Sequence, residues 1–302
     1  MIVSVDVPAS TANLGPGFDC LGLALELRNQ LELSETDGDL QVEIEGEGRA
    51  DLPVDASNLT VQAAFAVFDR LGERRRGLSF RCSNHIPLGS GLGSSSAAAV
   101  AGALAANALV SGELSLEQIL GIVFEIEGHA DNAAASLYGG LNAVASDSGE
   151  LIVRQLPAAD FTLTVIVPDI SLSTQAMRQA LPGSASLDDA TFNLGHALLL
   201  TEALRTGDLN LLDLAARDRL HQPYRLAHIP GFEEAEAAGR SAGARAVVLS
   251  GAGPGVVAFG GESSQVAEAM VKGFQHAGVK ARSWALPIAE KGAITRTDGS
   301  PS

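Results

Sequence analysis

The chain has 302 residues, of which 46% are hydrophobic and 19% charged, a composition typical of a globular protein rather than a disordered one. Twenty lysines and arginines against 36 aspartates and glutamates give a net charge of −16. Such an acidic surface repels the phosphates of nucleic acids and anionic membranes, so we expect neither as a partner. The N-terminus lacks the basic and apolar regions of a signal peptide, which favours a cytoplasmic location.

Lysine and cysteine are sparse and informative. The lysines are Lys272, Lys280 and Lys291, all near the C-terminus. A Walker-type phosphate loop and a protein-kinase strand both need a lysine much earlier in the chain, so the sequence predicts neither. Cys20 and Cys82 lie far apart with no Cys/His cluster, and nothing supports a disulfide framework or a structural zinc site.

The first half of the chain is predicted to alternate strands and helices. In chain order we expect a strand at 2–8, a loop at 8–19, strands at 21–27, 31–33 and 41–45, a helix at 58–71, a strand at 78–82, a helix from 87–96 to about 110, and a helix at 114–128. Asn58 or Ser57 is suited to begin the helix at 58–71, and Gly72 is suited to end it. Ser115 is suited to begin the helix at 114–128.

The second half mixes the two kinds of element without a regular βαβ repeat, which predicts an α+β fold. We expect strands at 141–144, 151–156, 162–167, 245–249, 255–259 and 280–285, and helices at 133–138, 174–180, 190–205, 208–219, 231–243 and 263–277. A boundary near Pro157 divides the chain into domains at 1–156 and 157–291, and the polar tail at 292–302 is expected to be disordered.

A glycine- and serine-rich segment connects a predicted strand to an alanine-rich helix. Its residues are Pro87, Leu88, Gly89, Ser90, Gly91, Leu92, Gly93, Ser94, Ser95, Ser96 and Ala97. Closely spaced glycines let a backbone approach a ligand, and the helix start offers unpaired N–H groups, so the segment is a candidate phosphate site. A serine-capped flexible turn is the alternative reading. The dinucleotide fingerprint and the hydrolase elbow both fail on spacing.

Two further motifs accompany this segment. They are PASTANLGPGFD at 8–19 and SGAGPG at 250–255. Together the three motifs resemble those of the GHMP kinases, which phosphorylate small molecules. Within that family the chain resembles the homoserine kinases most, through EGHADN at 127–132, TQAMRQALP at 174–182 and HQPYRLAHIPG at 221–231. These marks extend over most of the chain.

The resemblance implies a two-domain α+β GHMP kinase fold, with mixed and antiparallel sheets covered by helices and a ferredoxin-like C-terminal domain. It implies ATP-dependent phosphorylation of the hydroxyl of L-homoserine in threonine biosynthesis, with Mg²⁺ and a homodimeric assembly. Substrate contacts are implied at Asn13, Asp19, His129, Asn132, Thr174, Arg178 and Arg225. The nucleoside is implied to approach Asn58, and Mg²⁺ to be held by Glu127 and a loop serine, either Ser94 or Ser95. We select Ser95.

Elementary chemistry agrees with this assignment. A zwitterionic amino acid needs a carboxylate for its ammonium and guanidinium groups for its carboxylate, and Asp19 with Arg178 and Arg225 would supply them. Phosphoryl transfer requires mainly positioning and charge stabilisation. Asp131 is the candidate catalytic base, and a reaction without a discrete base is the alternative. Glu125 competes with Glu127 for the metal, because residues two apart on a helix cannot face one site.

Some positions depart from the family pattern, and other functions compete. Ala130 replaces a commoner proline and Ala252 a commoner serine, so a hydroxyl contact at position 252 is not expected. The enzymatic alternative is another GHMP kinase, acting on mevalonate or a sugar. The alternative from another class is a non-catalytic nucleotide-sensing relative, although Glu127 and the loop serines are present.

Overall fold

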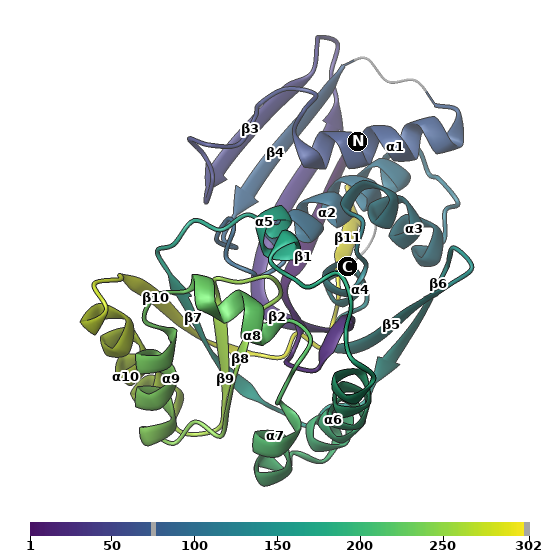
Figure 1. The fold of residues 1–302 in the computed structure, drawn as a ribbon. Helices are drawn as coiled ribbons and strands as arrows, with labels where there is room; N and C mark the ends of the chain where they lie inside the picture. The colour runs from purple at the N-terminus through teal and green to yellow at the C-terminus, as the bar shows by residue number, and fades with distance from the viewer. Residues whose placement is uncertain (74–76, 299–302) are drawn as a thin grey trace.

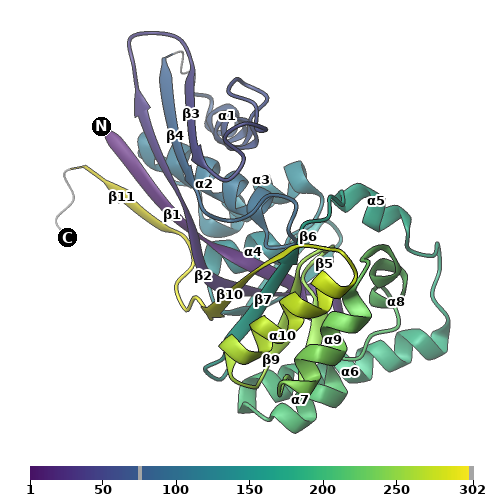
Figure 2. The ribbon, with the colours of Figure 1, turned by 90° about the vertical axis from the view of Figure 1, so that its left-hand side faces the viewer.

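The computed structural model describes residues 1–73 and 77–298, which form two sheets with helices packed against them (Figures 1 and 2). The larger sheet has the order β11-β1-β2-β4-β3, with β5 beside β2 and β6 beside β5. Its strands are β1 (Ile2–Asn13), β2 (Gly17–Glu35), β3 (Gln41–Gly46), β4 (Leu78–Asn84), β5 (Leu141–Asp147), β6 (Glu150–Leu156) and β11 (Ile294–Thr297). It is mixed, because β3 runs parallel to β4 while the other pairs are antiparallel.

Most of the segment predicted as a loop at 8–19 is strand. β1 continues through Pro8 to Asn13 and pairs antiparallel with β2, whose first residue is Gly17. Register shifts after Pro8 and after Ala12 interrupt the ladder. Residues 9–13 are buried on both sides, so they lack the alternation by which a half-exposed strand is found in a sequence. The prediction of a loop was therefore wrong for residues 8–13 and 17–19.

The helices of the first half are α1 (Leu59–Leu71), α2 (Ser94–Leu109), α3 (Leu116–Glu127) and α4 (Asp131–Tyr138). Of these, α2 and α4 pack on the larger sheet, and α1 and α3 pack on α2. The predicted ends of α1 and the predicted start of α3 are confirmed, whereas α4 begins at Asp131, two residues earlier than predicted. The Asn58 side chain accepts a hydrogen bond from the Thr60 N–H at 2.9 Å, and Gly72 ends α1 with a φ of 71°. Ser115 begins α3 in a capping box with Gln118, which satisfies N–H groups at the start of that helix.

Helix α2 lies in the core of this half. A Cβ on Gly102 would lie 2.0 Å from the Thr60 carbonyl oxygen, so the glycine allows α2 to pack closely against the start of α1. Most α2 side chains are buried, which is expected of a helix that is apolar all round. Among the described residues, no helix combines the length and the apolar character needed to cross a bilayer.

The smaller sheet has the order β10-β7-β9-β8 and is antiparallel. Its strands are β7 (Thr162–Pro168), β8 (Ala246–Leu249), β9 (Val256–Phe259) and β10 (Ala281–Pro287). The helices of this half are α5 (Thr174–Gln179), α6 (Leu187–Thr206), α7 (Leu209–Ala215), α8 (Gln222–Arg225), α9 (Phe232–Ser241) and α10 (Ser263–His276). α9 and α10 pack together against the sheet (Figure 2). The predicted α+β class is confirmed.

Two predictions for this half need correction. The helix expected over 208–219 ends at Ala215, because the chain then turns around the buried side chain of Asp218. The tail at 292–302 was expected to be disordered, but Ile294–Thr297 pairs antiparallel with β1. A polar segment can extend a sheet because the pairing uses backbone groups. Residues 299–302 lie outside the described part, and the domain division at 156/157 stays a prediction.

Candidate active site

Backbone hydrogen bonds join the three motifs, which are far apart in the sequence. The N–H of Ser10 donates to the Leu92 carbonyl at 3.1 Å, which links the first motif to the glycine- and serine-rich segment. The N–H of Gly255 donates to the Ser90 carbonyl at 3.0 Å, which links the third motif to the same segment. The segment at 87–97 is therefore held from both halves of the chain.

Ser250 strengthens this junction, and sequence reasoning did not single it out. Its side chain is fully buried; its Oγ donates to the Gly91 carbonyl at 2.7 Å and lies 2.9 Å from the Thr11 Oγ1. A Cβ on Gly91 would lie 2.2 Å from the Ser250 carbonyl oxygen, and the φ of Gly91 is 77°. Position 91 therefore requires glycine both for its conformation and for its contact.

The start of α2 is available to an anion. Gly93 precedes the helix with a φ of 67°, and no side chain caps the first turn. A Cβ on Gly89 would meet no atom within 4 Å, so the loop opens at that residue. The Ser90 hydroxyl donates to the Pro87 carbonyl at 2.7 Å. Backbone N–H groups with the positive end of the helix dipole are thus the main attraction for a negative ligand here.

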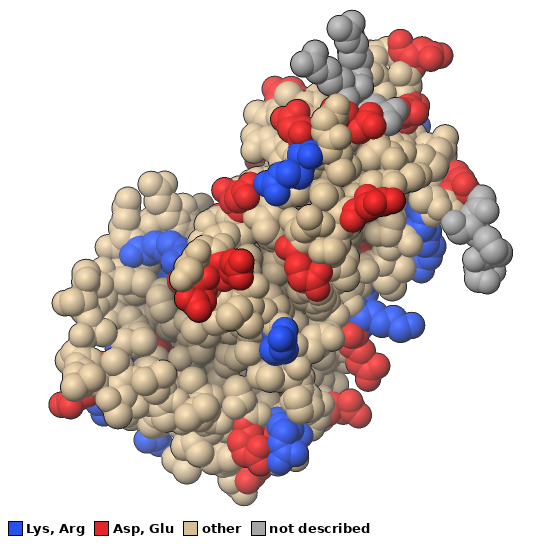
Figure 3. All heavy atoms as spheres, turned by 90° about the vertical axis from the view of Figure 1, so that its right-hand side faces the viewer, with Lys and Arg blue, Asp and Glu red and all other residues tan. Residues whose placement is uncertain are grey.

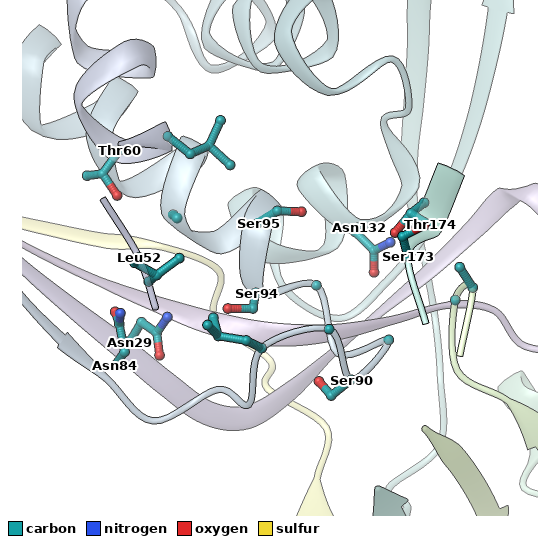
Figure 4. A pocket seen from close by; sticks show the side chains of 18 of the residues that line it. Asn29, Leu52, Thr60, Asn84, Ser90, Ser94, Ser95, Asn132, Ser173 and Thr174 are labelled. Atoms are coloured by element: carbon teal, nitrogen blue, oxygen red, sulfur yellow. The ribbon is translucent and has the colours of Figure 1, made fainter. Parts of the chain in front are cut away.

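A cavity of about 380 Å³ lies beside this segment (Figure 4). Leu52, Thr60, Asn29 and Asn84 lie on one side of it, and the loop serines separate them from Asn132, Ser173 and Thr174. Its size is within the usual range for a small-molecule site. The cavity continues toward a second hollow of about 580 Å³, since both are lined by Leu59, Ser95, His129 and Thr174.

The side chains at the end of the cavity near Asn58 are largely hydrogen-bonded to the protein itself. Asn58 lines the cavity, but its amide donates to the Pro53 carbonyl at 2.8 Å and its oxygen caps α1. Asn29 accepts from the backbone N–H groups of His85 and Ile86. Burial raises the pKa of the Cys82 thiol to about 11, so this wall carries a neutral thiol. At this end of the cavity, a ligand would therefore be recognised mainly by its shape and by apolar contacts.

Glu127 is the carboxylate that faces the helix start. Ser96 Oγ donates a short hydrogen bond to Glu127 Oε2. Glu125 instead pairs with Arg70 on the surface at 3.1 Å, away from the start of α2. Ser95, selected from the sequence as the metal ligand, is exposed and lines both cavities. The structure adds Ser96 as a second hydroxyl close to Glu127.

His129 and Asp131 meet at the border of the two cavities. His129 Nδ1 lies 3.5 Å from Asp131 Oδ1, and this carboxylate is the main cause that raises the pKa of His129. Asp131 is 3% exposed and accepts from the Asn132 N–H at 2.7 Å. Asn132 Oδ1 accepts from Ser10 Oγ at 3.0 Å. Within the described part of the chain, the cavities are lined by His129 and Asn132 and not by Asp131.

Asp19 and Arg178 form a bidentate ion pair, with N–O distances of 2.9 and 3.0 Å. Asn13 holds the aspartate in place, because its Oδ1 accepts from the Asp19 N–H at 2.9 Å while its Nδ2 donates to the Gly251 carbonyl at 2.8 Å. Asn13 and Asp19 adopt φ values of 69° and 54°, a conformation that asparagine and aspartate tolerate better than most residues. The structure thus brings together three of the predicted substrate residues.

Arg225 is a buried cation, and no carboxylate of the residues that the structure describes forms an ion pair with it. It is 2% exposed, and its guanidinium donates to the carbonyls of Met177 and Gly251, each at 3.3 Å. The guanidinium carbon lies 5.2 Å from the centre of the Phe18 ring. Burial is the main cause that lowers its pKa, and the charge of Arg178 adds to this effect. A buried cation held by neutral groups is suited to accept an anionic partner.

A second buried cluster adjoins this cation, since Arg225 Nη1 lies 3.4 Å from His221 Nδ1, and the sequence analysis did not identify its members as functional. Asp218 accepts from the N–H groups of His221 and Gln222 at 3.0 and 2.6 Å, and from Asn193 Nδ2 at 2.6 Å. His221 Nε2 donates to the Gly15 carbonyl at 2.8 Å. His221 lies within the motif at 221–231, whereas Asp218 and Asn193 have no local signal, because only the fold makes them neighbours.

Comparisons with known proteins agree with this geometry. Family models for the GHMP kinase N-terminal and C-terminal domains match residues 58–140 and 200–276. The chain is 42% identical to a homoserine kinase of Moorella thermoacetica, over 96% of this chain and 98% of the relative. It is 37% identical to a homoserine kinase of Carboxydothermus hydrogenoformans, over 97% of this chain and 96% of the relative.

Solved structures show the same relationship. A homoserine kinase from Cytophaga hutchinsonii superposes with a TM-score of 0.87 at 30% identity, covering 98% of this chain and 97% of the other. A mevalonate kinase from L. major has a TM-score of 0.71 at 20% identity, covering 95% and 96% of the two chains, and shares the fold. The resemblance inferred from the three motifs is thereby confirmed, and the chain belongs to the GHMP kinase family.

Proposed function

We propose that this chain transfers the γ-phosphoryl group of ATP to the hydroxyl of L-homoserine and so takes part in threonine biosynthesis. The observation that carries the proposal is a pair of guanidinium groups and a carboxylate, Arg178, Arg225 and Asp19, of which Arg178 lines the same hollow as Ser95 in the first turn of α2. Relatives that carry the name homoserine kinase match over nearly the full length of the chain. A mevalonate or sugar acceptor would not need groups for both ends of an amino acid.

In this proposal the triphosphate binds the backbone N–H groups of 87–97, and the nucleoside occupies the cavity near Asn58. Glu127 and the hydroxyl of Ser95 or Ser96 would hold Mg²⁺. Carboxylate and hydroxyl oxygens are ligands that Mg²⁺ prefers, and it commonly takes only one or two from the protein. Groups of three or more His, Cys, Asp or Glu side chains arranged for a metal do not occur in the described residues. When bound, Mg²⁺ would neutralise phosphate charge.

The acceptor would bind between the two arginines and Asp19. The Asp19–Arg178 pair already balances one charge of each sign. A bound zwitterion can therefore replace this pair, because its ammonium can pair with Asp19 and its carboxylate with Arg178. Its ammonium would contact Asp19, and its carboxylate would contact Arg178 and Arg225. Asn13, Asn132 and Thr174 would complete the polar contacts. Bidentate guanidinium–carboxylate contacts fix the orientation of the substrate as well as its affinity.

The proton of the acceptor hydroxyl has two routes. Asp131 can act as the base through or beside His129, whose pKa is raised by that carboxylate. The small exposure of Asp131 favours the second route, in which the phosphoryl group itself takes the proton and His129 only orients the hydroxyl. An Asp131→Asn variant separates them, since a required base predicts a loss of about 100-fold or more in kcat. A smaller loss supports the route without a base.

The proposal is tested by ATP turnover on homoserine, mevalonate, galactose and shikimate. We expect homoserine to have the highest kcat/KM by a wide margin. Preference for another acceptor would refute the substrate assignment, and nucleotide binding without turnover on a panel of amino-acid alcohols would favour a nucleotide-sensing relative. Parallel Ser95→Ala and Ser96→Ala variants, titrated with Mg²⁺, identify the hydroxyl that supports the metal.

The cellular setting completes the proposal. The reaction would take place in the cytoplasm, since its substrates are small polar molecules of amino-acid metabolism. The chain would act as a homodimer. Neither statement affects the chemistry assigned to the site, and each is tested separately, the first by fractionation of cells that express the protein.

A further inference from the structure

His221 lies between two parts of the candidate site that come from opposite halves of the chain. Its side chain is fully buried. Nε2 is 2.8 Å from the Gly15 carbonyl oxygen, and Nδ1 is 3.4 Å from Arg225 Nη1. Gly15 belongs to the turn between β1 and β2 that precedes Asp19, and Arg225 is the last residue of α8. The imidazole therefore joins the turn before Asp19 to the guanidinium proposed to bind the acceptor's carboxylate.

The neighbours of His221 assign the proton on its ring. Nε2 faces two acceptors, the Gly15 carbonyl at 2.8 Å and Asp218 Oδ2 at 3.6 Å, so Nε2 carries the proton. The neighbour of Nδ1 is the guanidinium of Arg225, which can only donate. Burial lowers the pKa of His221 and the charge of Arg225 adds to this effect, against the charges of Asp218 and Asp19. The ring is therefore neutral at neutral pH and accepts from Arg225 through Nδ1.

The hydrogen bonds of Arg225 lie along one edge of its guanidinium. Nε donates to the Met177 carbonyl and Nη1 to the Gly251 carbonyl, and Nη1 also donates to His221 Nδ1. A guanidinium has five N–H donors in a rigid plane, so these contacts fix the orientation of the whole group. Among the residues that the structure describes, none accepts a hydrogen bond from Nη2. Nη2 is therefore the part of Arg225 that is left for an incoming carboxylate.

Asp218 is a buried charge that fixes the backbone around His221. Charged side chains usually lie at the surface, as on the face shown in Figure 3, where water screens them. The Asp218 side chain is instead inaccessible, and it accepts from the N–H groups of His221 and Gln222 and from Asn193 Nδ2. The Phe18 ring stacks on the imidazole, with the ring centres 5.2 Å apart. The fold thus holds the imidazole in one place, as a group that orients a ligand-binding side chain requires.

We propose that His221 is a positioning residue for the acceptor. Its Nδ1 holds the guanidinium of Arg225 with Nη2 toward the acceptor's carboxylate, while its Nε2 ties that guanidinium to the turn before Asp19. This role rests on the proposed function and adds to it the residue that sets the separation of the groups for the two ends of an amino acid. Because His221 acts on the acceptor only through Arg225, its loss should weaken binding equally in the ground state and the transition state. The KM for homoserine should then rise while kcat changes little.

Three substitutions of His221 separate the orientation of Arg225 from general support of the fold. His221→Asn keeps an acceptor close to the position of Nδ1, and His221→Gln keeps a donor close to the position of Nε2. His221→Phe keeps a ring against Phe18 without either hydrogen bond. We expect His221→Phe and His221→Gln to raise the KM for homoserine about tenfold or more, the effect of losing one hydrogen bond to a charged group. His221→Asn should recover most of this loss, and the KM for ATP should stay within about twofold in all three.

Gln222→Leu is the matched control, because Gln222 is the next residue, is also buried, and accepts from the Leu249 N–H of β8 rather than from Arg225. It should lower the melting temperature, measured by circular dichroism, without changing the KM for homoserine. The inference is overturned if His221→Phe changes this KM no more than Gln222→Leu does, or if His221→Gln recovers more of it than His221→Asn. Should His221→Phe not fold, the comparison of His221→Asn with His221→Gln decides. A wild type that does not phosphorylate homoserine refutes the proposed function and this role with it, whereas wild-type turnover with unaltered variants refutes this role alone.

Discussion

The ion pair between Asp19 and Arg178 connects two proposed substrate-binding groups in the free protein, and its removal separates their structural role from their functional one. The side chains are 40% and 39% exposed. Exposed pairs contribute about 0.2–1 kcal/mol to the free energy of unfolding. Arg178→Ala should therefore lower the melting temperature by no more than about 4 °C, and the protein should remain folded.

The effect on catalysis should be much larger than the effect on stability. A hydrogen bond to a charged group contributes about 1.5–3 kcal/mol, which corresponds to a loss of about 10- to 150-fold in kcat/KM for homoserine. The KM for ATP should change little, because the glycine- and serine-rich segment at 87–97 is held by Ser250 and by backbone contacts that Arg178 does not make. Steady-state kinetics with each substrate varied in turn measures both quantities.

Charge reversal and a matched control complete this test. The double variant Asp19→Arg with Arg178→Asp can form an ion pair again, so it should melt at a higher temperature than Asp19→Arg alone, which places arginine at a φ of 54° that aspartate tolerates better. It should not recover homoserine turnover, because a cation then occupies the place of the ammonium-binding carboxylate. Arg70→Ala breaks another exposed pair, with Glu125, and should leave kinetics unchanged. The reasoning fails if Arg178→Ala keeps kcat/KM for homoserine within twofold of the wild type.

Three further predictions concern the buried parts of the site. Arg225→Lys keeps a positive charge but loses the planar fork that Met177 and Gly251 hold, so the KM for homoserine should rise at least tenfold; an unchanged KM would remove Arg225 from the site. Gly91→Ala places a Cβ 2.2 Å from a carbonyl oxygen and should raise the KM for ATP at least tenfold in kinetic assays, more than that for homoserine. Burial lowers the pKa of His221, so the unfolded chain binds its proton more readily, and stability should fall as pH drops below about 6.5. Urea unfolding at pH 7.5 and 5.5 measures this loss, which should be smaller in His221→Gln; equal losses would contradict the assignment.

Local signals in the sequence were sufficient for several helix ends and for the turn at the glycine- and serine-rich segment. Asn58, Gly72 and Ser115 were predicted as caps and are caps in the structure, because a cap depends on a few neighbouring residues. The glycine and serine pattern at 87–97 likewise predicted a turn that leads into a helix start. Its glycines are required at positions such as Gly91, where the φ is positive.

Strand pairing could not be read locally in two places. Residues 8–13 and 294–297 were predicted as loop and disordered tail, yet both belong to the larger sheet. Their hydrogen-bond partners lie far away in the sequence or across a hairpin, and their own residues do not alternate between apolar and polar. The pairing energy comes from backbone groups, which every sequence provides.

The sequence by itself determined the kinds of groups in the candidate site: a glycine-rich backbone, arginines and an aspartate, and a glutamate. The tertiary structure decided which of them are partners. It directs Glu127 to Ser96 while Glu125 pairs with Arg70 on the surface, and it surrounds the buried guanidinium of Arg225 with neutral groups. The physical reason is that burial and hydrogen-bond geometry depend on the packing of segments that the chain order keeps far apart.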